Sequence, residues 1–253
     1  MIKFFRRIRQ NLLSENKFSK YLFYAIGEII LVVIGILIAL QLNNYSESKK
    51  ERKQEVSLLT NLANEIKLDI LQIENSTEIS TKRLSRLDSI VQLLENSSNI
   101  DKSLFIEKSF EFVIDQYFKS NSGIFDEAVS SGRMSYVQNE ELRQNIFDYY
   151  RNASESDNDG TTRQVTDELI TPIFVETLFM NPEGFSSLGL NVQNIANLES
   201  IDLKALKENR DFWKMVLLKF GSNREQMSRW YEIKLQAQDV KQQIEHELGN
   251  LKE

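Results

Sequence analysis

The stretch YLFYAIGEIILVVIGILIALQL, from Tyr21 to Leu42, decides the architecture of this 253-residue chain. It holds 22 residues and a single charged side chain, Glu28. At about 1.5 Å of rise per residue, such a helix spans about 33 Å, and the hydrocarbon core of a bilayer is about 30 Å thick. A cleaved signal peptide has a shorter apolar run and a small-x-small cleavage site, which Ala39-Leu40-Gln41 does not supply. We therefore predict one transmembrane helix over residues 21–42.

Basic residues flank this segment unequally. Residues 1–20 carry six Lys and Arg against one acidic residue, whereas the first residues beyond the segment mix four Lys and Arg with three Glu. The positive-inside rule counts mainly Lys and Arg, so it places the N-terminus in the cytoplasm. We expect residues 43–253 to lie outside the cytoplasmic membrane, in the periplasm if the cell has an outer membrane.

The first 13 residues, MIKFFRRIRQNLL, separate apolar from basic side chains when they are placed on a helix. Such a helix lies in the membrane interface, where each basic residue near anionic lipid contributes about 1 kcal/mol. We expect residues 1–20 to be a cytoplasmic amphipathic segment that contacts the bilayer through Lys3, Arg6, Arg7 and Arg9. A disordered basic segment that only sets the topology is the alternative.

The composition of the remaining chain excludes some classes of partner and site. Residues 43–253 carry 25 basic and 35 acidic residues, a net charge of −10, which argues against binding to nucleic acid or to anionic lipid. The chain has no cysteine, so it has neither disulfide bonds nor thiolate metal ligands.

The N-terminal third contains a distinctive string. SENKFSKY over residues 14–21 is followed by AIGE and VVIGILIALQ, and a later stretch over residues 125–150 contains SGR and FDYY. In these motifs, most strongly over residues 1–44, the chain resembles an uncharacterised family of bacterial single-pass membrane proteins, known only as a domain of unknown function. The resemblance implies a bacterial cytoplasmic (inner) membrane anchor and a helical domain, and it supplies no activity, cofactor or catalytic residue.

A possible association face lies inside the predicted span. Glu28, Gly35 and Ala39 fall on nearly one side of a helix, and Gly35-x-x-x-Ala39 is a small-xxx-small pattern that allows two helices to approach closely. A carboxylate near the bilayer centre costs about 2.5–3.5 kcal/mol, so such residues usually face protein. We predict that this face binds a protein partner or a second copy. A tolerated acid near the membrane edge is the alternative.

Beyond the span, apolar residues recur every three or four positions, which predicts an all-α fold with a long stalk-like helix and a helical bundle. The apolar stripe of the long helix begins at Val56, and the helix ends at Asn96-Ser97-Ser98-Asn99. Thr77 and Ser80 interrupt the stripe. A second stripe runs from Trp230 to Leu251. The two stripes could pack antiparallel in one chain or form a dimeric coiled coil.

The shorter helices are marked by caps and breaks. Asp101 and Asn139 are candidate N-caps, for helices that should run to about Lys119 and to Asn152, and Gly221-Ser222-Asn223 is a candidate break in the last long helix.

Catalytic and metal sites have little support. His246 is the only histidine and looks exposed, and no phosphate-binding or nucleophile motif is present. Glu155, Asp157, Asp159 and Gly160 partly match a calcium loop, but its twelfth position holds Thr166 in place of a bidentate Glu. We therefore expect no enzyme activity, no cofactor and no bound metal.

Two functions fit these observations. The outer domain is either a protein-interaction or scaffolding module of the cell envelope, or a ligand-sensing bundle that signals through a partner membrane protein. Because only 20 residues are expected in the cytoplasm, a sensor would need that partner for its output. The first hypothesis is therefore favoured.

Overall fold

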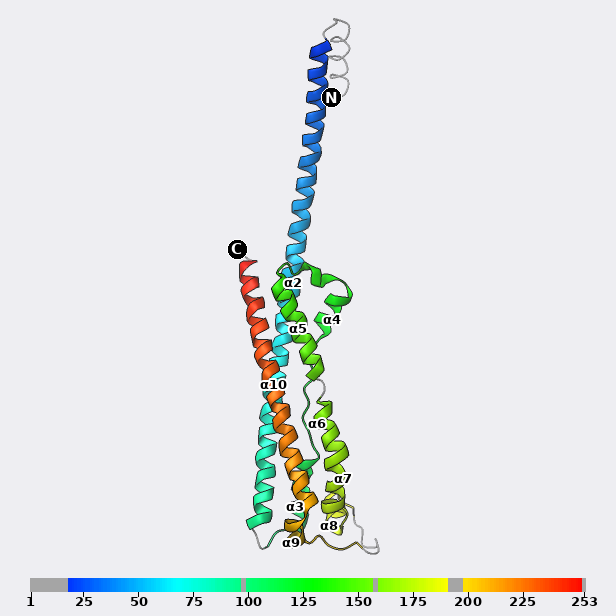
Figure 1. Cartoon of the computed structure of the whole chain (residues 1–253), viewed down its shortest axis with the longest axis vertical. Coiled ribbons are helices and arrows are strands. Elements are labelled where there is room, and N and C mark those ends of the chain that lie inside the picture. Colours follow the sequence, from blue (N-terminus) through cyan, green and yellow to red (C-terminus); the bar gives the residue numbers. More distant parts are fainter. Residues whose placement is uncertain (1–17, 97–98, 157–158, 191–197, 252–253) are drawn as a thin grey trace. The chain divides into compact units, whose positions relative to one another are not determined.

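A computed structural model describes residues 18–96, 99–156, 159–190 and 198–251. Every regular element in these ranges is a helix, and no strand occurs in them (Figure 1). The predicted all-α fold class is confirmed. The chain divides into two compact units, Met1–Val56 and Ser57–Glu253, and the long helix α2 (Phe18–Asn96) contributes to both.

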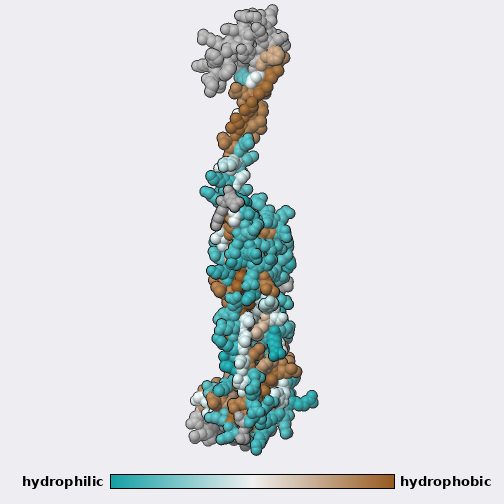
Figure 2. Space-filling model, turned by 90° about the vertical axis from the view of Figure 1, so that its left-hand side faces the viewer, coloured by the Kyte–Doolittle hydropathy of each residue, from teal (hydrophilic) through white to brown (hydrophobic). Residues whose placement is uncertain are grey.

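In the first unit, α2 exposes a long apolar surface. Its large apolar side chains from Leu22 to Leu42 lie mostly in the open, and Figure 2 shows them as a hydrophobic band. An apolar window of 18 residues in this helix has a mean hydropathy of 2.6, and none of that window is buried. By length and composition, this helix could span a membrane.

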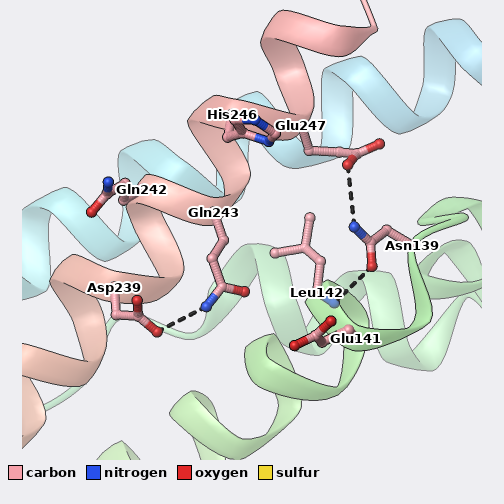
Figure 3. A pocket seen from close by; sticks show the side chains of 8 residues that line it. All are labelled: Asn139, Glu141, Leu142, Asp239, Gln242, Gln243, His246 and Glu247. Atoms are coloured by element: carbon pink, nitrogen blue, oxygen red, sulfur yellow. Dashed lines mark hydrogen bonds between the residues drawn. The ribbon is translucent and has the colours of Figure 1, made fainter.

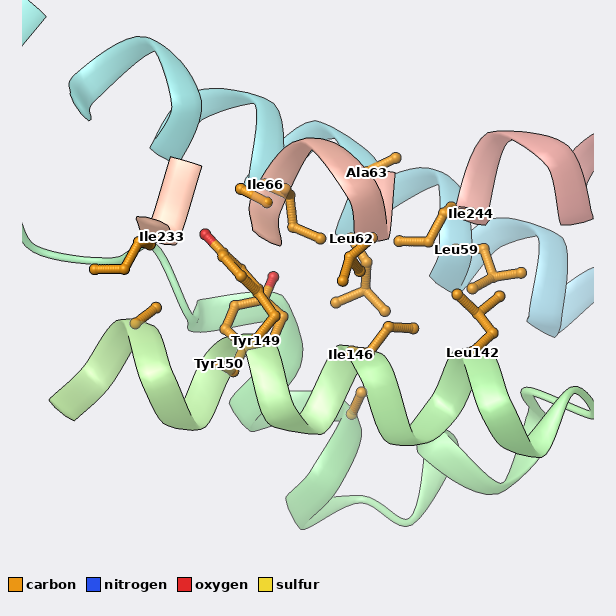
Figure 4. Packing of buried hydrophobic residues seen from close by; sticks show 14 of the residues in the cluster. Leu59, Leu62, Ala63, Ile66, Leu142, Ile146, Tyr149, Tyr150, Ile233 and Ile244 are labelled. Atoms are coloured by element: carbon orange, nitrogen blue, oxygen red, sulfur yellow. The ribbon is translucent and has the colours of Figure 1, made fainter. Parts of the chain in front are cut away.

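The second unit is a bundle in which α2, α5 (Glu140–Ser156) and α10 (Arg210–Asn250) share a core. Helix α10 runs antiparallel to α2 (Figure 1), and Lys234 on α10 pairs with Glu74 on α2 at 3.2 Å. The two predicted apolar stripes thus pack within one chain. Together with α5 they form most of the first cluster, in which α2 contributes from Leu58 to Ile73 and α10 from Trp230 to Ile244. Figure 4 shows part of it, including Leu62 of α2, Ile146 of α5 and Ile244 of α10.

A second cluster of buried apolar residues fills the other end of the bundle. It holds Leu87, Ile90 and Leu94 of α2 and the first buried residues of α10, Phe212 and Met215. The rest comes from shorter elements and the segments beside them: α3 (Lys102–Ser109), the 3-10 turn η1 (Phe110–Phe112), the π turns η3 (Val165–Ile170) and η4 (Val175–Phe179), α7 (Thr171–Phe174) and α9 (Leu203–Glu208).

Predicted helix boundaries are confirmed at several points. Helix α2 ends at Asn96, the first residue of the predicted stop Asn96-Ser97-Ser98-Asn99. The side chain of Asp101 accepts a hydrogen bond from the N–H of Leu104, and that of Asn139 from the N–H of Leu142, each at 3.1 Å, as N-cap residues do. The remaining helical elements are α4 (Gly123–Ser130), η2 (Arg133–Tyr136), α6 (Gly160–Gln164) and α8 (Pro182–Ser187).

Three predicted boundaries are wrong. The helix that begins after Asp101 does not reach Lys119, because residues 114–122 have no regular structure. Helix α5 continues past Asn152, since Ala153 is buried in the first cluster. Helix α10 runs through Gly221-Ser222-Asn223 without a break. A glycine inside a helix costs about 1 kcal/mol, and the packing of a buried helix face outweighs that cost.

Candidate functional site

The predicted association face lies on an accessible part of α2. Gly35 and Ala39 are exposed and Glu28 is partly buried, and a Cβ atom added to Gly35 would meet no other atom within 4 Å. Close approach of another helix along this face stays a prediction. The predicted membrane-surface residues Lys3, Arg6, Arg7 and Arg9 lie outside the described residues.

The partial calcium motif is used differently in the structure. Asp159 is buried and accepts a hydrogen bond from the N–H of Phe118 at 2.8 Å, and the Thr166 hydroxyl donates to Asp115. The side chains of Glu155 and Asp157 lie outside the described part of the chain. In that part, no three acidic or histidine side chains are grouped as metal ligands.

His246 is exposed, as expected, and lines an open groove of about 380 Å³ between α5 and α10. The groove is polar, and Asn139 closes one side by donating to Glu247 at 3.2 Å (Figure 3). The described residues place no nucleophile or second histidine beside His246 there. This groove therefore contains no recognisable catalytic arrangement.

The unusual feature of the bundle is a polar layer between the two hydrophobic clusters. Between Ile73 and Leu87, α2 buries only polar side chains, and between Met215 and Trp230, α10 does the same. A bundle core normally buries apolar residues at these positions. We define the polar layer as Ser76, Ser80, Arg83, Asp115, Asp159, Thr162, Thr166, Lys219, Asn223 and Gln226.

An ion pair lies at the centre of the polar layer. The ammonium of Lys219 is 2.6 Å from Oδ1 of Asp115, and both side chains are fully buried. The side-chain amide of Asn223 also donates to the Asp115 carboxylate, at 3.2 Å. The Thr166 hydroxyl donates to the same carboxylate. Burial lowers the pKa of Lys219, although the nearby Asp115 acts in the opposite direction.

A second ionic group borders the layer. The carboxylate of Glu111 accepts hydrogen bonds from Arg83 at 3.3 Å and from Arg86 at 2.7 Å. Arg83 is nearly fully buried and Arg86 is half exposed, so Glu111 joins the layer to the surface. Beside it, an open groove of about 420 Å³ is lined by Arg86 and Glu111 and by apolar residues of the second cluster and its edge, including Ile90, Leu93, Phe110 and Ile114.

Side chains of the surrounding helices hold the irregular stretch from Ile114 to Ser122, which we name the connecting segment. Lys219 donates to the carbonyl of Ile114 at 2.8 Å, and Gln226 donates to that of Gln116 at 3.0 Å. The connecting segment forms no helix because these side chains satisfy its backbone groups and because its β-branched and aromatic residues favour a helix weakly.

Two carboxylates of α2 hold the far end of the connecting segment and the start of α4. Asp69 accepts hydrogen bonds from the N–H of Asn121 at 2.8 Å and from Tyr149 at 2.6 Å. Glu65 accepts from the N–H of Ile124 and from Tyr150, each at 2.7 Å. Burial raises the pKa of Asp69, despite the opposing effect of its hydrogen bonds, and burial also raises the pKa of Asp159.

Sequence reasoning missed the polar layer, although a signal for it was present. Lys219, Asn223 and Gln226 continue the spacing of three and four that leads to Trp230, so they occupy buried positions of the same stripe. Reading Gly221-Ser222-Asn223 as a helix break concealed that register. In α2, Ser80 was recognised as an interruption of the stripe, but the members of the layer on α10 lie far away in the chain.

Comparison with known proteins gives one match. The profile of a family described as "Family of unknown function (DUF6090)" matches residues 28–155, which include the second part of the apolar segment and the connecting segment. No curated protein and no solved structure matches the chain. Because the match covers half of the sequence, the chain belongs to this family of unknown function.

Proposed function

We propose that this chain is a membrane-anchored interaction module of the bacterial cell envelope. In this proposal, residues 21–42 cross the cytoplasmic membrane, residues 1–20 lie in the cytoplasm and residues 43–253 lie in the periplasm. The unburied apolar surface of α2 and the excess of basic residues before it support this topology. A reporter fused after Glu253 and active only in the periplasm should therefore work, and one active only in the cytoplasm should not.

The proposal rests on an open groove on the surface of the bundle. The long apolar stripes of the bundle are buried inside one chain, and two grooves open on its surface. The groove at Ile90, Leu93 and Phe110 combines an apolar floor with charged edges. Such surfaces suit the side chains of a partner protein.

Crosslinking in native membranes, followed by mass spectrometry, tests the proposal. A partner protein should be recovered with the wild-type chain and lost with Ile114→Asp, which places a charge in the groove. Leu217→Asp is the matched control, because Leu217 is 74% exposed and does not line the groove. If the partner is recovered equally with both variants, it does not bind at the groove. If no specific partner is recovered with the wild-type chain, the proposal is contradicted.

A ligand-sensing bundle that signals through a partner is the second candidate. The size of the groove, about 420 Å³, supports it, because small-molecule sites usually occupy about 300–1,000 Å³. The two candidates differ in a thermal-shift screen of small amphipathic molecules. A sensor predicts a compound that raises the melting temperature of the wild-type chain but not that of Ile114→Asp.

A further inference from the structure

We propose that the polar layer is a joint, which allows the second cluster to open and rearrange while the first cluster stays folded. The layer interrupts apolar burial on both long helices at once, from Ser76 to Arg83 on α2 and from Lys219 to Gln226 on α10. Because apolar burial is the main source of cooperative stabilisation, each cluster has its own stabilisation and the layer between them has little.

The backbone packed against the two long helices is also irregular at the layer. The connecting segment depends on side chains such as Lys219 and Gln226 for its hydrogen bonds. On the third side of the layer, Thr166 belongs to the π turn η3. π turns interrupt α-helical hydrogen bonding and often occur at functional sites. At this level α2 and α10 keep helical hydrogen bonding but bury polar side chains, and the connecting segment has no regular hydrogen bonding.

The polar contacts within the layer join the clusters only weakly. The attraction within a buried ion pair such as Lys219–Asp115 is largely offset by desolvation of its two charges. Several buried atoms of the layer have no hydrogen-bond partner, which further reduces its net stabilisation. These atoms are Ser76 Oγ, Ser80 Oγ, Arg83 Nη1, Asp159 Oδ1, Asn223 Oδ1 and Gln226 Oε1.

A joint at this level has a structural consequence for the groove at Ile90, Leu93 and Phe110. These residues belong to the second cluster or pack against it, so opening of that cluster reshapes the groove without disturbing α5. The inference concerns how the bundle is divided and does not rest on the proposed function.

Native-state hydrogen exchange of the full chain in detergent, read by mass spectrometry, tests the joint. Leu62→Ala and Leu87→Ala make the same change at fully buried positions of α2, one in each cluster. Leu87→Ala should accelerate exchange of α3 and α9 amides at least about tenfold. Leu62→Ala should accelerate exchange in α5 by a similar factor and leave α3 and α9 within about twofold of the wild type.

The opposite pattern would overturn the proposal. If Leu62→Ala accelerates exchange in α3 and α9 as much as in α5, the two clusters open as one unit and the layer is not a joint. Should either alanine variant fail to fold, Ile66→Val and Ile90→Val provide a milder pair, again with one buried residue in each cluster. The same comparison between α5 and the two elements α3 and α9 then decides the outcome.

Discussion

Lys219 on α10 and Asp115 in the connecting segment form an ion pair of 2.6 Å in which neither side chain is exposed to solvent. The same ammonium donates to the carbonyl of Ile114, so one side chain satisfies both a charge and a backbone group of the connecting segment. Loss of this lysine would leave a carboxylate buried without its cation. Such a charge is costly because the protein interior replaces little of its lost hydration.

The first prediction concerns the removal of this cation. Lys219→Ala should lower the free energy of unfolding by about 3–5 kcal/mol, the usual cost of leaving one member of a buried pair. The double change Lys219→Met with Asp115→Leu should cost less, because neither charge is then left alone. Urea unfolding measures both. Lys214→Ala, at an exposed position of the same helix, is the control and should change stability little.

Two outcomes would contradict this first prediction. If Lys219→Ala is as mild as Lys214→Ala, the pair is not buried in solution as the structure describes. If the double variant is less stable than Lys219→Ala, the two charges contribute net stabilisation, and the layer would bind the clusters together more strongly than the joint requires.

The second prediction is a pH dependence that comes from Asp69. Burial raises the pKa of Asp69 in the folded state above its ordinary value, so the folded chain takes up this proton at a higher pH than the unfolded chain does. The favourable contribution is complete below the unfolded pKa of about 3.9 and is lost as the pH rises through the folded pKa. Lowering the pH from 7 through this window should therefore stabilise the wild type relative to Asp69→Asn.

The comparison isolates this one carboxyl group, because all other titrating groups are common to both proteins. Unfolding free energies of the wild type and Asp69→Asn are measured from pH 7 to pH 4. Their difference should move in favour of the wild type as the pH falls. A difference that is constant with pH, or that moves the other way, contradicts a raised pKa at Asp69.

The comparison of sequence and structure shows which features can be predicted. Long periodic stripes, such as Trp230 to Ile244, predicted their helices and their burial correctly, because one face alone decides both. The caps Asp101 and Asn139 were predictable because they act within one turn. The connecting segment was not, because its backbone partners Asp69 and Gln226 are distant in the chain. The local sequence shows neither which backbone group Asp69 binds nor which one Gln226 binds.

The third prediction is that residues 155–168 bind no calcium specifically. Asp159 is buried, and Asp159 and Thr166 have partners inside the bundle, Phe118 and Asp115, so calcium binding would have to rearrange this part of the bundle. The thermal midpoint of the chain should be the same with millimolar calcium and with chelator. If calcium did bind, a hundredfold excess of calcium over its dissociation constant would raise the free energy of unfolding by about 2.7 kcal/mol. A thermal melt resolves such a change easily. A clear calcium-dependent rise would show that the motif binds.

The last prediction concerns association through the apolar segment of α2. Replacement of Gly35 or Ala39 by Leu should hold two helices apart and weaken crosslinked complexes in native membranes, while the segment stays apolar enough to insert. Val33→Leu is the control, because Val33 is exposed and lies on the opposite side of the helix from Gly35. It should leave the complexes unchanged.

Substitution of Glu28 then separates two ways in which this residue could act. A glutamine can still hydrogen-bond across helices but can neither form an ion pair nor exchange a proton. If Glu28→Gln keeps the complexes and Glu28→Leu loses them, the residue acts by hydrogen bonding; if both lose them, its charge or its proton is required. Unchanged complexes for Gly35→Leu, Ala39→Leu and Glu28→Leu alike would mean that this face contacts only lipid, and any assembly would then have to form through residues 43–253.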